Sequence, residues 1–113
     1  YMASGTHAKA RDVLKLALKD RTHFLALEAQ YMEGDAFYLE ERYDEAIRSF
    51  LQTQLYKDGS LWQSKGLLMI GQSHRALKRF DRAKHYFEKL LDRYPQSDAA
   101  KSAIEALRTL DKS

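Results

Sequence analysis

The sequence predicts an all-α fold in which helical hairpins stack on one another. Residues that favour helices dominate the 113-residue chain, which has only five glycines and one proline. A stretch that starts at Gly34 returns at Gly71, shifted by 37 positions. In both copies, apolar residues recur at helical spacing on either side of a short polar break. A constant shift of this size is typical of stacked-repeat proteins.

The bulk composition predicts one domain that covers residues 1–113. Because 44% of the residues are hydrophobic, the chain has enough apolar material for one modest core. It has no cysteine, which rules out disulfides and thiolate metal sites. It also lacks the roughly eighteen consecutive apolar residues that a membrane span needs, so we expect no membrane insertion by this segment.

The first predicted element is a helix over residues 7–20, preceded by residues 1–5 as a linker. Ala10 and Leu14 have the spacing that the second helices of the later hairpins show. We therefore interpret this segment as the second helix of a truncated repeat whose first helix is absent. The apolar residues that this would leave uncovered are Val13, Leu16 and Leu18.

Two full hairpins are predicted next, over residues 24–58 and 61–95. The polar stretches LEERYD and LKRFD divide each hairpin into two helices. We expect Asp44 and Asp81 to act as the N-caps of the second helices, because a short side-chain oxygen can accept a hydrogen bond from an unpaired backbone N–H.

Each hairpin has a glycine inside its first helix. Glycine in a helix interior costs about 1 kcal/mol relative to alanine, so its recurrence needs a packing reason. We expect Gly34 and Gly71 to let the two helix axes approach where the second helix shows Ala46 or Ala83. A phenylalanine one turn later would then fill the next layer.

A final helix over residues 98–110 is predicted to cap the stack. Pro95 ends the preceding helix, and Ser97 is placed to act as the N-cap of the new one. The apolar stripe expected to face the stack contains Ala100, Ala103, Ile104 and Leu107.

The second hairpin carries the residues of a known repeat pattern. They are Leu67, Ile70, Gly71 and His74 on the first helix, followed by Phe80, Ala83, Phe87 and Pro95. This pattern resembles the tetratricopeptide repeat. The first hairpin retains it at Gly34, Phe37, Tyr43, Ala46 and Phe50. The resemblance implies about five or six helices wound into a right-handed superhelix.

The length of the repeat suggests a subgroup of this family. The shift of 37 residues exceeds the usual repeat length of about 34. The segments ALEAQYMEGDAFYLEERYDEAIRSF and YPQSDAAKSAIEAL resemble longer repeats of bacterial envelope proteins, namely the C-terminal domain of the Tol-Pal cell division coordinator and the outer-membrane assembly lipoprotein. The resemblance implies a location in the bacterial periplasm or on the periplasmic face of the outer membrane. A cytoplasmic location is the alternative.

The sequence lacks the motifs that mark a reaction centre. No paired histidine spacing for a metal, no nucleophile elbow and no glycine-rich phosphate loop occurs. We therefore expect no enzymatic activity, no cofactor and no metal. Acidic residues near a helix start complement the helix dipole, and this is the simpler explanation for the local acidic cluster. That cluster contains Glu40, Glu41, Asp44 and Glu45.

Three polar residues have predicted structural roles. His74 falls at an aromatic core position, where we expect a packed, hydrogen-bonded imidazole. His85 is expected to face water. Glu33 occupies a position that is Ile70 in the next hairpin, and we expect it to be shifted to the edge of its helix.

The resemblance places function on the concave face that the first helices of the hairpins line. The residues predicted to contact a peptide or protein partner there are Glu28, Tyr31, Asp35, Tyr38, Lys65, Leu68, Gln72 and Arg75. Lys65 and Arg75 could hold a carboxylate of an acidic segment, and the two tyrosines offer rigid amphipathic surface. The alternative for Tyr31 and Tyr38 is that they pack between the repeats.

Two other functions stay open at this point. The uncovered apolar residues near the start of the chain could make it a homo-oligomer. The charge is uneven, with a net −2 over residues 1–58 and +5 over residues 59–113. This could favour an anionic partner for the second half or head-to-tail self-association, whereas ordinary solvated helix faces are the simpler explanation. We do not expect nucleic acid as a partner, since the aromatic residues near the basic ones belong to the predicted core. The basic residues are Lys78, Arg79, Arg82, Lys84, Lys89 and Arg93.

Overall fold

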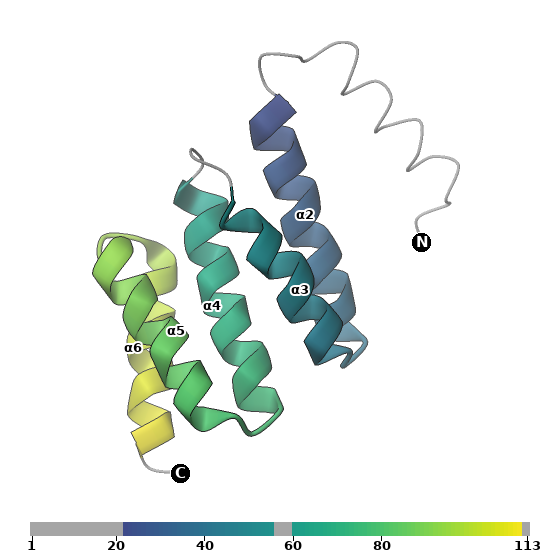
Figure 1. Cartoon of the computed structure of the whole chain (residues 1–113). Coiled ribbons are helices and arrows are strands. Elements are labelled where there is room, and N and C mark those ends of the chain that lie inside the picture. The colour runs from purple at the N-terminus through teal and green to yellow at the C-terminus, as the bar shows by residue number, and fades with distance from the viewer. Residues whose placement is uncertain (1–21, 56–59, 112–113) are drawn as a thin grey trace.

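The described part of the chain is built from α-helices alone. The computed structural model describes residues 22–55 and 60–111, and within these ranges it has no strand (Figure 1). The helices are α2 (Thr22–Leu39), α3 (Tyr43–Thr53), α4 (Ser60–Ala76), α5 (Phe80–Arg93) and α6 (Asp98–Asp111). The predicted all-α fold is confirmed. The predicted helix at 7–20 and the linker before it lie outside the described residues.

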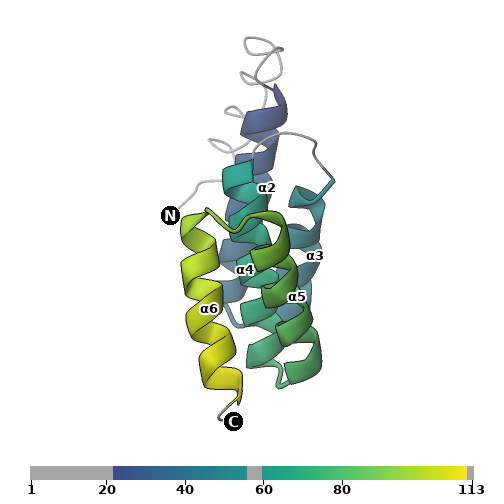
Figure 2. The ribbon, with the colours of Figure 1, turned by 90° about the vertical axis from the view of Figure 1, so that its left-hand side faces the viewer.

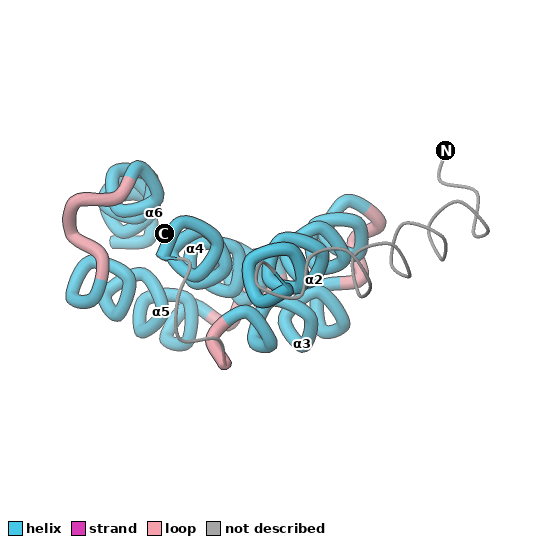
Figure 3. Tube along the Cα trace, turned by 90° about the horizontal axis from the view of Figure 1, so that it is seen from above, coloured by secondary structure: helices cyan, strands magenta, loops and turns pink. Residues whose placement is uncertain are grey.

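The helices are arranged in two layers. Figure 3 shows α2, α4 and α6 in one layer, with α3 and α5 in the other. Helix α2 packs on α3 and α4 packs on α5 as two hairpins, and the contact of α3 with α4 joins them. Viewed from one end of the stack, α6 and α5 lie in front of α4 (Figure 2). Among the described helices, none is long and apolar enough to cross a membrane.

Equivalent residues of the two hairpins form the core. Ala46 and Phe50 of α3 are fully buried, and so are Ala83 and Phe87 of α5. Ile70 of α4 packs in the cluster that contains Phe50, between the two hairpins. The repeat therefore buries the same positions twice.

Helix α6 covers the second hairpin with its alanines. The cluster around Phe87 includes the buried Ala99, Ala103 and Ala106. Small side chains let α6 approach this hairpin closely. The predicted stripe is correct at Ala100 and Ala103 but wrong at Ile104, which is 47% exposed. The helix is rotated so that its alanines, rather than its branched residue, face the core.

A phenylalanine ring lies directly on each of the two repeated glycines. A Cβ atom placed on Gly34 would be 2.6 Å from ring atoms of Phe50, and one on Gly71 would be 2.5 Å from Cε1 of Phe87. The predicted close approach at the glycines is confirmed, but the phenylalanine expected in the next layer lies on the glycine itself. Each ring occupies the space that a β-carbon would fill.

A third buried glycine lies between the hairpins. The space beside Gly66 of α4 is taken by the side chain of Thr53 of α3. The Thr53 hydroxyl donates a 2.6 Å hydrogen bond to the carbonyl of Phe50, so this polar group is satisfied inside the contact. Gly66 thus serves the packing of one hairpin against the next.

The turn within each hairpin has the same geometry. Glu41 and Lys78 adopt left-handed conformations with φ of 62° and 63°. The N–H of Arg42 donates to the carbonyl of Phe37 over 2.9 Å, and the N–H of Arg79 donates to that of His74 over 2.8 Å. These bonds form a Schellman motif, which ends the first helix and reverses the chain. Glycine usually fills this left-handed position, but here both residues have side chains.

This turn also explains why one capping prediction is wrong. Helices α3 and α5 begin at Tyr43 and Phe80, and no side chain makes a capping hydrogen bond at either start. Asp44 and Asp81 lie inside the first turn instead. There their negative charge still complements the helix dipole. The Schellman turn moves the helix start ahead of the aspartates.

Asp44 has a second role, which links the two hairpins. Its carboxylate accepts hydrogen bonds of 2.9 Å and 3.4 Å from the guanidinium of Arg79, in the turn of the second hairpin. This hydrogen-bonded pair lowers the pKa of Asp44. Glu40 and Glu45 of the same acidic cluster pair with Arg42. Part of the cluster is therefore used in ion pairs.

The predicted cap of the last helix is confirmed. The hydroxyl of Ser97 accepts a 3.1 Å hydrogen bond from the N–H of Ala100 and donates a 2.7 Å bond to the carbonyl of Tyr94. Glu33 is exposed at the edge of α2, as predicted. Its carboxylate accepts a 2.9 Å hydrogen bond from the hydroxyl of Ser49 on α3.

His74 lies at the buried position that the repeat pattern predicts. It is 5% exposed, and its ring stacks on Tyr86 with 5.6 Å between centroids. The predicted hydrogen bond is missing at Nδ1, which has no partner among the described residues. Burial lowers the pKa of the imidazole, and the nearby Arg79 and Arg82 lower it further. His85 is exposed, as predicted.

Replacing Gly71 with alanine should destabilise the protein despite alanine's better helix propensity. Overpacking against Phe87 costs about 1 to 3 kcal/mol, while the propensity gain is about 1 kcal/mol. We expect the free energy of unfolding to fall by about 1 kcal/mol, measured by urea denaturation. In a Phe87→Leu background the same change should cost less, because the smaller side chain leaves room for the methyl group. If Gly71→Ala lowered the free energy of unfolding equally in both backgrounds, contact with the Phe87 ring would not be the cause of the destabilisation.

His74 should make stability depend on pH in the weakly acidic range. Because folding lowers its pKa, the unfolded chain binds the proton more readily. The stabilisation is complete above the unfolded pKa of about 6.5 and is lost as the pH falls. We expect His74→Phe to reduce the drop in unfolding free energy between about pH 7.5 and about pH 5.5. An equal drop in wild type and His74→Phe would contradict this role of His74.

Candidate functional site

The residues predicted to contact a partner lie on two neighbouring helices. Glu28, Tyr31, Asp35 and Tyr38 belong to α2, and Lys65, Leu68, Gln72 and Arg75 belong to α4. All eight side chains are partly buried. They lie in the layer formed by α2, α4 and α6, which we call the inner layer (Figure 3).

An aromatic cluster joins α2 to α4 at one end of this layer. The ring of Tyr31 lies 5.3 Å from that of Phe50 and 5.2 Å from that of Trp62, measured between centroids. Tyr31 therefore packs between the repeats, which was the alternative prediction for it. The ammonium of Lys65 lies 4.8 Å from the centroid of Trp62. This cation–π contact positions the Lys65 side chain across the aromatic surface.

Further along α2 and α4 lies a group of polar and charged side chains. Tyr38 packs edge-on against Tyr43 with 5.3 Å between centroids. Its pKa is raised by burial and by its neighbours Tyr43 and Asp35, whereas Arg75 of α4 acts to lower it. The fold thus brings Asp35, Tyr38 and Arg75 into electrostatic contact across the junction of α2 and α4.

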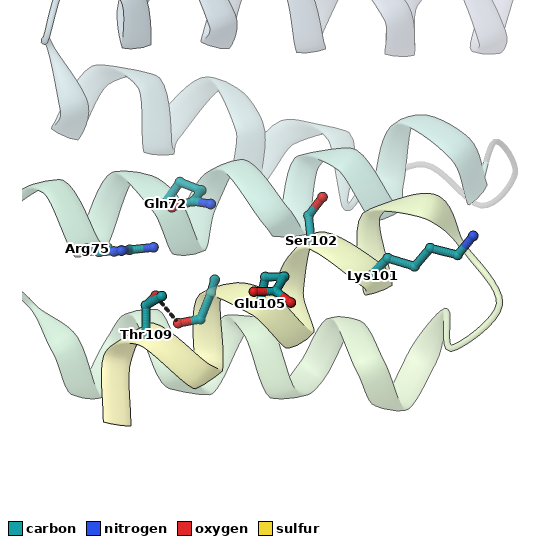
Figure 4. Close-up of a pocket in the computed structure, with 7 residues that line it drawn as sticks. Gln72, Arg75, Lys101, Ser102, Glu105 and Thr109 are labelled. Carbon is teal, nitrogen blue, oxygen red and sulfur yellow. Dashed lines mark hydrogen bonds between the residues drawn. The ribbon is translucent and has the colours of Figure 1, made fainter. Parts of the chain in front are cut away.

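A surface hollow of about 470 Å³ lies between α4 and α6. Figure 4 shows Gln72 and Arg75 of α4 across from Ser102, Glu105 and Thr109 of α6, while Lys101 extends away from them. The full lining consists of Gln72, Arg75, Lys101, Ser102, Glu105, Ala106 and Thr109. Two of the predicted residues therefore meet a second helix that contributes polar groups of its own.

The charges of this hollow are only partly neutralised. Glu105 pairs with Arg108 on its own helix at 2.8 Å. The carboxylate of Asp98 lies 3.8 Å from the Lys101 ammonium. Among the described residues no carboxylate lies within ion-pair distance of Arg75. Arg75 is thus a cation in the hollow without an internal acidic partner.

The structure gives the remaining predicted residues different surroundings. Leu68 packs against the core cluster of the second hairpin. Glu28 lies three residues before Tyr31 on α2. The apolar residues behind the self-association alternative, near the start of the chain, lie outside the described residues.

Sequence reasoning missed Trp62 and the contribution of α6. Trp62 is the single tryptophan of the chain and lies three residues before Lys65, on the same side of a helix. On α6, Lys101, Glu105 and Thr109 are spaced four residues apart, which marks one polar helix face. That spacing predicts a polar face on α6. Which helix lies opposite this face is decided only by tertiary packing.

The arrangement offers groups that can bind another molecule. In the described ranges, no group of three or more histidine, aspartate or glutamate residues is close enough together to hold a metal ion. The inner layer presents cations beside aromatic rings and amide or hydroxyl groups. Such a surface can accept carboxylates and apolar side chains together.

Comparison with known families agrees with the repeated geometry. A tetratricopeptide repeat family model matches residues 1–59, and a second tetratricopeptide repeat model matches residues 65–97. No significant match was found among curated proteins or among solved structures. Tetratricopeptide repeats generally mediate protein–protein interaction and are typically non-enzymatic. With its stacked hairpins, repeated glycines and matched residues, the chain belongs to the tetratricopeptide repeat family.

Proposed function

We propose that the inner layer binds an acidic segment of a protein partner. The observation that supports this most directly is Arg75, a cation in the hollow between α4 and α6 without an internal carboxylate partner. A guanidinium held in such a place can form two parallel hydrogen bonds with a carboxylate. The binding module needs no catalytic group for this role.

The other residues of the face extend the proposed site along α2 and α4. Lys65 offers a second cation above the rings of Tyr31 and Trp62. The ring of Trp62 gives a preformed surface on which an apolar part of the partner can pack with little loss of conformational entropy. Gln72, beside Arg75, can donate to and accept from a peptide backbone.

Location in a bacterial envelope is part of this proposal. Its support is the 37-residue shift and the resemblance of two segments to envelope repeats. Fractionation of the native cells tests it, with recovery in the cytoplasmic fraction as the contradicting result.

Reversing the two cations should abolish most of the binding. We expect K65E/R75E to weaken the binding of acidic peptides, selected from a displayed random library, by about 3 kcal/mol or roughly 150-fold in Kd. The expected cause is repulsion from two new negative charges on the face. Both side chains are partly exposed, so the helical content measured by circular dichroism should not change.

A matched control separates local contacts from net charge. K84E/R93E makes the same charge change at exposed positions of α5, outside the inner layer. We expect this variant to bind within about threefold of the wild type at physiological salt, because exposed distant charges are screened. Equal losses in both variants would show that the selected peptides respond only to overall charge.

A further inference from the structure

A second hollow lies in the other layer, between α3 and α5. Its volume is about 530 Å³. Its lining residues are Asp44, Ile47, Arg48, Leu51, His74, Arg79, Asp81, Arg82, His85 and Tyr86. None of these belongs to the predicted partner-binding residues. We call this hollow the outer groove.

The outer groove has apolar surface along its lining. Ile47 and Leu51 lie one turn apart on α3, with Ile47 buried and Leu51 37% exposed. Tyr86 of α5 contributes a ring that is held between the imidazoles of His74, stacked on it, and His85, edge-on to it. A ligand can therefore bury apolar surface here against partly fixed side chains.

Arginines flank this apolar surface. Arg79 is committed to its ion pair with Asp44. Arg48 of α3 and Arg82 of α5 are exposed, and neither forms an ion pair with a described residue. Asp81 is the other acidic group of the lining. Arg79 and Asp44 neutralise each other. The remaining charges of the lining are the two cations Arg48 and Arg82 and the one carboxylate of Asp81.

One polar atom beside the groove lies in the core and has no hydrogen-bond partner among the described residues. His74 is 5% exposed, and its Nδ1 has no hydrogen-bond partner among the described residues. Such a buried, unsatisfied group is uncommon, because it forgoes the hydrogen bonds that water would provide. This atom is not accessible from the groove, so His74 contributes to the lining through the stacking of its ring on Tyr86.

We propose that the outer groove is a second binding site, which accepts a protein side chain or segment that combines apolar surface with a carboxylate. Arg48 and Arg82 hold the carboxylate, and Ile47 and Tyr86 contact the apolar part. This site lies in the opposite layer from the inner-layer site. The protein would then bind two acidic segments on different surfaces.

A small probe tests this site in the full chain. The probe is 3-phenylpropionate, which carries a ring and a carboxylate, compared with its neutral amide and with inorganic phosphate. Binding is followed by ¹H–¹⁵N correlation spectra of the protein. We expect saturable shifts on α3 and α5 around the groove with the carboxylate, and at least about tenfold weaker binding of the amide and of phosphate.

Matched variants distinguish the groove from general charge attraction. R48Q/R82Q should weaken probe binding at least about tenfold, whereas K84Q/R93Q, with the same charge change at other exposed positions, should not. Unchanged helical content by circular dichroism verifies that the variants fold. Equal binding of the amide, equal binding of phosphate, or equal losses in the two variants would overturn the proposal. The K65E/R75E variant changes no residue of the outer groove, so it should still bind 3-phenylpropionate there. A failure of the inner-layer site would therefore not alter the result of this experiment.

Discussion

The fold depends on the contact between a phenylalanine ring and a bare glycine backbone in each hairpin. The rings of Phe50 and Phe87 lie where the β-carbons of Gly34 and Gly71 would be. This contact sets the closest approach of the two helices, and the fully buried Ala46 and Ala83 lie on the same second helices. Both hairpins pack this way, so the second can stack on the first with α3 against α4. The glycine that weakens each first helix locally is therefore offset by tertiary packing.

The turns and the junction between hairpins fix how the layers are oriented. Schellman motifs centred on Glu41 and Lys78 end the first helix of each hairpin in the same geometry. The ion pair between Asp44 and Arg79 connects the start of α3 to the turn of the next hairpin. At the junction, Gly66 lies against Thr53. The local turns and the contacts between hairpins thus favour the same arrangement of the helices, as expected for a fold that the sequence specifies well.

Two layers of helices give the molecule two chemically different surfaces. The inner layer combines Lys65 and Arg75 with aromatic rings and with the polar face of α6. The outer groove combines Arg48 and Arg82 with a buried imidazole. Stacking creates both surfaces, since each is formed by helices from different hairpins or from a hairpin and α6. A single hairpin could supply only one side of either site.

The sequence by itself determined the class of fold, the repeated core positions and the cap at Ser97, because helical spacing, a constant shift and capping chemistry are local properties. It also placed the eight candidate residues on the two helices where they are found. Tertiary structure alone decided that the rings of Phe50 and Phe87 cover the glycines, that Asp44 pairs with Arg79, and that α6 completes the hollow beside Arg75. These features depend on the rotation of each helix and on which helices become neighbours. A rotation of α6 that exposes Ile104 and buries alanines follows from the shape of the hairpin that it covers.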